Sequence, residues 1–117
     1  MTGRISYHAG LAAEDQVAQI YVRSGRAIAA RRWRGSCGEI DLIARDGANV
    51  IFIEVKKSKS HARAAERLTD RQIARIYGAA SEFLGGEPRG QATDVRFDVA
   101  LVDCHGRIEL RENVFAA

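Results

Sequence analysis

Two acidic residues and one lysine occupy positions from which two neighbouring strands could bring them together. Asp41 lies in the segment 38–43, and Glu54 and Lys56 lie in the segment 52–56. Proteins usually bind Mg²⁺ with one or two carboxylates together with waters and substrate phosphate oxygens. An ammonium group beside such a site can hold an attacking water or stabilise charge that develops on a phosphoryl group. These residue types therefore indicate metal-assisted chemistry on a phosphate.

The two segments are predicted to form a β-hairpin, because Asp46 and Gly47 separate two strand-forming runs, 38–45 and 50–57. Side chains alternate along a strand, so each strand is expected to place its charged site residues on one face. These faces carry Glu39, Asp41, Ile43 and Arg45 on the first strand, and Val50, Phe52, Glu54 and Lys56 on the second. A turn that pairs Asp46 with Asn49 sets Asp41 opposite Glu54.

The same register sets Glu39 opposite Lys56, which leaves two interpretations of the charged face. Facing carboxylates destabilise a hairpin, and a divalent cation between Asp41 and Glu54 would remove that repulsion. The alternative is an exposed face on which Glu39 and Lys56 form a salt bridge and both acids are solvated. The opposite face is expected to carry the apolar residues Ile40, Leu42, Ile51, Ile53 and Val55. A sheet covered on both sides favours the cation, because unpaired buried carboxylates are costly.

Hydrophobic periodicity and turn residues predict the elements that hold this hairpin. In chain order we expect a helix over 9–24, strands over 26–33, 38–45 and 50–57, a basic loop or frayed helix over 58–68, a helix over 69–84 capped by Thr69, and strands over 94–103 and 107–115. The order α-β-β-β-α-β-β predicts an α/β fold with a mixed sheet flanked by helices.

Length and composition fit one globular domain spanning 1–117, with 46% hydrophobic and 28% charged residues. The chain has no apolar run of about 18 residues and no apolar leader, so a cytoplasmic protein without a membrane span is expected. Two cysteines are too few for a disulfide framework. The formal charge is +3, and arginine provides most of the basic residues. Arginine suits phosphate recognition, although genome base composition gives an equally good account of its abundance.

A set of short motifs runs through most of the chain. They are Gly38-Glu39-Ile40-Asp41-Leu42-Ile43 and Phe52-Ile53-Glu54-Val55-Lys56, together with Gly10, Glu14, Gly25, Gln72-Ile73 and Arg96-Phe97-Asp98. In this combination the sequence resembles the YraN-like family of small bacterial proteins. That family is assigned to the restriction-endonuclease-like fold and is similar to archaeal Holliday junction resolvases. The resemblance implies this fold and a metal-dependent nuclease site of the PD-(D/E)xK type.

The resemblance also implies a role for each matching residue. Asp41 and Glu54 would be ligands of Mg²⁺ or Mn²⁺, and Lys56 would be the catalytic lysine. Glu14 would reach in from the first helix as an additional acidic residue, directly or through water. Glu39 belongs to the family motif and is a further candidate. Gln72 is a candidate for orienting substrate or water, with an ordinary surface role as the alternative.

Two departures from the family pattern concern substrate contacts. Ser58 stands where the family usually has Arg, and Arg71 stands where it usually has Lys. Basic residues after the hairpin, Lys57, Lys59 and Arg63, are expected to follow a nucleic-acid backbone together with Arg71, unless this segment is only a solvated loop.

These expectations combine into a nuclease that hydrolyses phosphodiester bonds in DNA, with branched and single-stranded DNA as the substrates considered. Resolvase-like relatives imply a homodimer. The alternative is a non-catalytic module of the same fold that binds nucleic acid or a protein. The intact Asp41, Glu54 and Lys56 favour the nuclease, whereas the modest charge of +3 favours the binding module.

Overall fold

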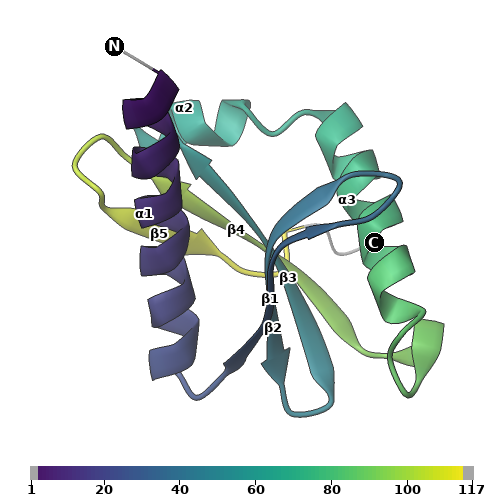
Figure 1. Ribbon diagram of the computed structural model, residues 1–117. Coiled ribbons are helices and arrows are strands. Elements are labelled where there is room, and N and C mark those ends of the chain that lie inside the picture. Colours follow the sequence, from purple (N-terminus) through teal and green to yellow (C-terminus); the bar gives the residue numbers. More distant parts are fainter. Residues whose placement is uncertain (1–2, 115–117) are drawn as a thin grey trace.

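The computed structural model describes residues 3–114, with side chains from Ala12 onward. A five-stranded sheet lies between helices on its two faces (Figure 1). The elements are α1 (Gly3–Arg23), β1 (Ala27–Arg34), β2 (Glu39–Asp46), β3 (Asn49–Lys57), α2 (His61–Glu66), α3 (Asp70–Leu84), the short 3-10 helix η1 (Gly90–Ala92), β4 (Val95–Val102) and β5 (Ile108–Arg111).

The strands are ordered β1-β2-β3-β4-β5 across the sheet. Neighbouring strands are antiparallel except for β3 and β4, which are parallel. A parallel pair needs a crossover connection, and α2 and α3 provide it between β3 and β4. This mixed α/β sheet confirms the predicted fold class and is consistent with the restriction-endonuclease-like fold.

Two apolar clusters pack against opposite faces of the sheet. On one face, α1 contributes a stripe at helical spacing that includes Val17 and Tyr21 and packs on Leu42 and Ile53. On the other face, α3 contributes Ile76, Ala79, Ala80 and Leu84, which pack on Ile43, Phe52 and Phe97. The sheet is therefore covered on both sides, as its apolar residues predicted.

The first helix and the last strand differ most from the sequence prediction, and the segment 58–68 contains the helix that was one of its two predicted alternatives. Helix α1 begins at Gly3, before the apolar stripe from which it was predicted. The segment 58–68 contains a short helix, α2, whose start is capped by Ser60 accepting a hydrogen bond from the Arg63 N–H at 3.2 Å. Strand β5 ends at Arg111, because the chain then turns through Asn113 with φ 53°. The end of the predicted strand, 115, lies outside the described residues.

Within residues 3–114, none of the helices has the length and apolar character needed to cross a membrane.

Candidate active site

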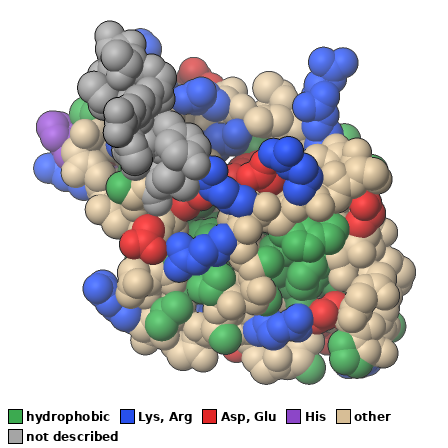
Figure 2. Space-filling model, viewed as in Figure 1, with side chains coloured by type: hydrophobic (Ala, Val, Ile, Leu, Met, Phe, Trp, Pro, Cys, Tyr) green, Lys and Arg blue, Asp and Glu red, His purple; other side chains and the backbone are tan. Residues whose placement is uncertain are grey.

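A cavity of about 420 Å³ opens beside the charged half of the β2–β3 hairpin, between α1 and α3. Its lining residues are Glu14, Arg32, Gly38, Glu39, Asp41, Glu54, Val55, Lys56, Gln72, Arg75 and Ile76. In the space-filling view, acidic side chains lie recessed in this region with basic side chains around them (Figure 2). The cavity thus brings together all six predicted catalytic and auxiliary positions, Glu14, Glu39, Asp41, Glu54, Lys56 and Gln72.

The hairpin register is as predicted in its apolar half. The pairing of β2 with β3 runs from Asp46 opposite Asn49 to Leu42 opposite Ile53. Beyond that pair, the backbone N–H of Val55 donates to the Asp41 carboxylate at 2.8 Å. The residue-by-residue pairing of β2 with β3 thus ends before the charged half, and the cavity is lined by side chains of that half.

Strand β2 also reverses its faces at Asp41, which corrects one prediction. Ile40 was expected on the face of Leu42, but it packs with Ile43 in the cluster under α3. In β1 the residue between the pairs Arg31–Leu42 and Trp33–Ile40 is Arg32, whose backbone is left-handed with φ 50°. Such a backbone interrupts strand alternation. Alternation along an ideal strand could not anticipate it.

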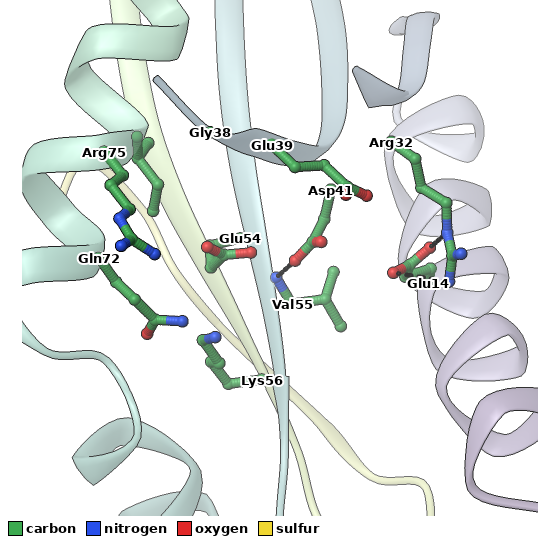
Figure 3. Close-up of a pocket in the computed structure, with 11 residues that line it drawn as sticks. Glu14, Arg32, Gly38, Glu39, Asp41, Glu54, Val55, Lys56, Gln72 and Arg75 are labelled. Atoms are coloured by element: carbon green, nitrogen blue, oxygen red, sulfur yellow. Dashed lines mark hydrogen bonds and ion pairs between the residues drawn. The ribbon is translucent and has the colours of Figure 1, made fainter. Parts of the chain in front are cut away.

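Asp41 and Glu54 face each other across the floor of the cavity (Figure 3). Glu54 is 9% exposed, and its strand neighbours Phe52 and Ile53 are core residues. Burial, reinforced by the Asp41 carboxyl beside it, raises the pKa of Glu54 to about 9 against the opposing charge of Lys56. Two carboxylates held this closely favour either a shared proton or a cation.

Lys56 and Gln72 lie on the α3 side of Glu54 (Figure 3). Lys56 follows Glu54 by two residues on β3, so both point to the same face. Gln72 comes from the first turn of α3, which Thr69 caps by accepting from the Gln72 N–H at 3.2 Å. The side-chain Oε1 of Gln72 is buried without a hydrogen-bond partner in the described structure. A buried acceptor of this kind is suited to a ligand that brings a donor or a positive charge.

Glu14 reaches the cavity from α1, where Arg32 of β1 holds it. The Nε of Arg32 lies 3.0 Å from Glu14 Oε2, and the Nη2 lies 3.5 Å from Oε1. Burial raises the pKa of Glu14, and the charges of Asp41 and Glu39 add to this effect, while Arg32 opposes it. The prediction for Glu14 did not include this arginine. Arg32 stands in a run with Arg31 and Arg34, and nothing in that run marks Arg32 as the partner of Glu14.

Glu39 lines the cavity, but its carboxylate forms an ion pair with Arg34 at 3.1 Å. The alternative Glu39–Lys56 salt bridge is therefore not the pairing that the structure shows. Arg75 of α3 is a second cavity residue that sequence analysis missed, although Gln72, one turn earlier in the same helix, was a candidate.

The loop between β1 and β2 is fastened to α3 and forms one wall of the cavity. Glu82 accepts hydrogen bonds from the Ser36 N–H at 3.0 Å, the Ser36 hydroxyl at 2.9 Å and the Cys37 N–H at 3.0 Å. These bonds lower the pKa of Glu82 to about 2. The packing is close: a Cβ at Gly78 would lie 2.8 Å from the Cβ of Cys37. This wall fixes the chain that leads into Glu39.

The four predicted nucleic-acid contacts do not line the cavity. Lys57 ends β3, Lys59 and Arg63 lie at the start of the crossover, and Arg71 lies in the first turn of α3. All but Lys57 are exposed. Their role remains a prediction.

The donor set suits a hard cation better than a zinc-type centre. Within the described part of the chain, no three His, Cys, Asp or Glu side chains converge to hold a metal ion by themselves. Asp41 and Glu54 instead offer a pair of carboxylates beside an open cavity. Mg²⁺ and Mn²⁺ accept such oxygen ligands and complete their shells with water and phosphate oxygens. The residues present therefore fit this class of ion.

Comparisons with known proteins cover nearly the whole chain. The model of the uncharacterised protein family UPF0102 matches residues 13–102. A UPF0102 protein of Cereibacter sphaeroides strain ATCC 17029 is 73% identical over 117 residues, which is all of both chains. A UPF0102 protein of Ruegeria pomeroyi is 57% identical over 113 residues, 97% of this chain and 92% of that protein. A UPF0102 protein of Dinoroseobacter shibae is 44% identical over 105 residues, 90% of this chain and 78% of that protein.

Proposed function

The chain belongs to the UPF0102 family, the YraN-like family that its motifs indicated, and on this basis we propose that it is a metal-dependent nuclease of the PD-(D/E)xK type. The proposed reaction is hydrolysis of phosphodiester bonds in DNA. The observation that carries the proposal is the pair Asp41 and Glu54 beside Lys56 in one polar cavity. A sheet that served only stability would gain nothing from placing these like charges together.

Asp41 and Glu54 would hold Mg²⁺ or Mn²⁺. When bound, the ion supplies a Lewis acid that polarises the scissile phosphate and neutralises its developing charge. Asp41 is prepared for this role, because the Val55 N–H fixes its Oδ2 at 2.8 Å and so orients the carboxylate. Glu54 is held by a strand that pairs with β4 as far as Lys57 opposite Val102. Glu54 is therefore held by backbone pairing with β4, and Asp41 by the hydrogen bond from Val55.

Lys56 and Gln72 act on the substrate side of this pair. The Lys56 ammonium group would stabilise negative charge on the phosphate as the bond to the leaving oxygen breaks. The amide of Gln72, with its buried and unpartnered Oε1, would accept a hydrogen bond from the attacking water and so orient it. Arg75, on the same cavity wall, would bind a neighbouring phosphate through its planar guanidinium.

A binding module of the same fold is the second candidate, and the formal charge of +3 favours it. Strong electrostatic binding of DNA depends on several Lys or Arg contacts to phosphates. In this structure the basic residues Lys59, Arg63 and Arg71 lie outside the cavity. Such a module would bind nucleic acid or a protein and leave phosphodiester bonds intact.

Cleavage of labelled single-stranded, duplex, flap and four-way-junction DNA in Mn²⁺ tests the proposal. The wild type is compared with Glu54→Ala and with the control Asp46→Asn, which alters an exposed acid at the far end of β2. We expect cleavage of at least one substrate, a loss of about 100-fold or more in Glu54→Ala, and normal activity in Asp46→Asn. Retention of DNA in Ca²⁺ without cleavage in Mn²⁺ would favour the binding module. Equal cleavage by wild type and Glu54→Ala would contradict the proposed site.

A further inference from the structure

Arg32 occupies a backbone conformation that arginine rarely adopts. Its φ of 50° lies in the left-handed region, which is unfavourable for residues that carry a Cβ. The residues on either side, Arg31 and Trp33, pair regularly with Leu42 and Ile40 of β2. Non-glycine residues held in this way are concentrated at functional sites. The Arg32 side chain lines the cavity, where it meets Glu14 (Figure 3).

The neighbouring arginine provides an internal comparison. Arg31 pairs with Asp15 at 3.2 Å, so the same two elements, α1 and β1, are joined by two successive ion pairs. The Arg31–Asp15 pair is exposed and does not line the cavity, whereas Glu14 has a side chain only 17% exposed and its pair does. Joining α1 to β1 does not require a strained arginine, because Arg31 already does so. The second pair, between Arg32 and Glu14, affects which carboxylates of the cavity can bind a cation.

The ion pair with Arg32 limits what the Glu14 carboxylate can bind. While the Arg32 guanidinium binds both of its oxygens, Glu14 is a poor ligand for a cation, and Asp41 and Glu54 remain as the available carboxylates. A guanidinium binds phosphate with the same planar fork that it offers to a carboxylate. A substrate phosphate that enters this cavity would therefore compete with Glu14 for Arg32.

We propose that Arg32 is an exchangeable counter-ion. It pairs with Glu14 in the free protein and moves to a substrate phosphate when one binds, which leaves the Glu14 carboxylate able to bind the cation beside Asp41. This inference rests on the proposed nuclease function and adds a coupling to it. Phosphate binding raises the affinity for Mg²⁺ or Mn²⁺ by adding a third carboxylate, and by linkage the cation raises the affinity for phosphate to the same degree. The protein would then hold its ion firmly only when substrate is present.

Calorimetric titration with Mn²⁺ in the absence of DNA tests the exchange without any measurement of activity. Arg32→Asn removes the guanidinium, and asparagine tolerates the left-handed backbone. We expect Arg32→Asn to bind Mn²⁺ about tenfold more tightly than the wild type, because Glu14 is released. The double variant Arg32→Asn/Glu14→Gln should return to about the wild-type affinity. Arg31→Asn, the matched control, should leave the affinity unchanged.

A second variant, Arg32→Lys, keeps the exchange testable if Arg32→Asn fails to fold. Arg32→Lys keeps a positive charge beside Glu14 and is expected to bind Mn²⁺ less tightly than Arg32→Asn, with both folds checked by thermal unfolding. An Arg32→Asn affinity equal to or weaker than wild type would show that Arg32 is only a fixed support, and would overturn the exchange. A double variant as tight as Arg32→Asn would exclude Glu14 as the released ligand. Absence of Mn²⁺ binding in every protein, wild type included, would contradict the cation site itself.

Discussion

Asp98 and Glu54 are buried carboxyl groups on adjacent strands, and their surroundings are opposite in kind. Asp98 is 1% exposed and receives hydrogen bonds from the Tyr21 hydroxyl at 2.7 Å, from the Arg96 guanidinium at 2.9 Å and from the Asn113 N–H at 3.0 Å. Glu54 lies on the next strand and faces the like charge of Asp41. The first site is complete in the protein alone, whereas the second leaves two acids facing each other, and a bound cation would offset their charge.

The difference between the two sites also appears in the pKa values of Tyr21 and Glu54. Burial of the Tyr21 hydroxyl and its hydrogen bond to Asp98 raise the pKa of Tyr21, so this donor keeps its proton. Burial and the neighbouring Asp41 raise the pKa of Glu54, which means that its charged form is disfavoured where it stands. A buried acid surrounded by donors is a structural element, whereas a buried acid facing another acid is the stronger candidate for function.

The largest expected effect on stability belongs to Asp98. Asp98→Ala removes the acceptor of the buried Tyr21 hydroxyl and the main ion-pair partner of Arg96. Among the described residues, Arg96 then keeps only Glu112, at 3.9 Å. We expect a loss of about 3–5 kcal/mol in the free energy of unfolding, measured by urea denaturation. Mn²⁺ should stabilise the folded fraction of this variant against heat as much as it stabilises the wild type. A loss below about 1 kcal/mol would contradict the structural assignment of Asp98.

Glu54→Gln should have a smaller effect on the free energy of unfolding, and of the opposite sign. The amide has about the same shape and carries no ionisable group, so it avoids the cost that burial and the neighbouring Asp41 impose on the Glu54 carboxylate. We therefore expect stability to rise by about 1 kcal/mol without metal. The variant should also lose the thermal stabilisation that Mn²⁺ gives the wild type. If Glu54→Gln were as destabilising as Asp98→Ala, the two sites would not differ in the way described.

The smallest effect is expected at Glu82, which fastens the β1–β2 loop to α3. The pKa of Glu82 is lowered to about 2 from an ordinary value near 4.5, so its charged form contributes stability above that ordinary value. This contribution is lost as pH falls from about 4.5 towards 2. Glu82→Gln should therefore unfold at a lower temperature than wild type at pH 7, and the difference should shrink below pH 4. A difference that did not depend on pH would contradict a role for the charge.

Sequence patterns predicted the part of the hairpin that obeys ideal strand geometry. The pairing of Ile43 with Phe52 and the turn at Gly47 follow from alternation and turn chemistry, and both are present. The reversal of Ile40 could not be predicted, because alternation assumes a regular backbone and the neighbouring strand holds the left-handed residue Arg32 between the partners of Leu42 and Ile40. Patterns within one strand carry no information about such a distortion in its partner.

In the candidate site, too, some residues could be predicted from the sequence and others could not. Asp41, Glu54 and Lys56 could be predicted because a single hairpin brings them together. Glu14 was reached only through resemblance to a family, since a helix must be docked before its acid can be placed. Arg75 was missed because its position in the cavity depends on how α3 packs against the β1–β2 loop. Local geometry can be predicted from sequence spacing, whereas contacts between distant elements need the fold.

The central claim is that Asp41 and Glu54 form a site for a divalent cation, and calorimetric titration with Mn²⁺ tests it most directly. Wild type, Asp41→Asn and Asp46→Asn are compared under one condition. Asp46 belongs to the same strand but pairs with Arg26 at the far end of the hairpin, so it is a matched control. We predict one saturable Mn²⁺ site in wild type and Asp46→Asn, and its loss in Asp41→Asn. Binding by Asp41→Asn with wild-type affinity would contradict the account.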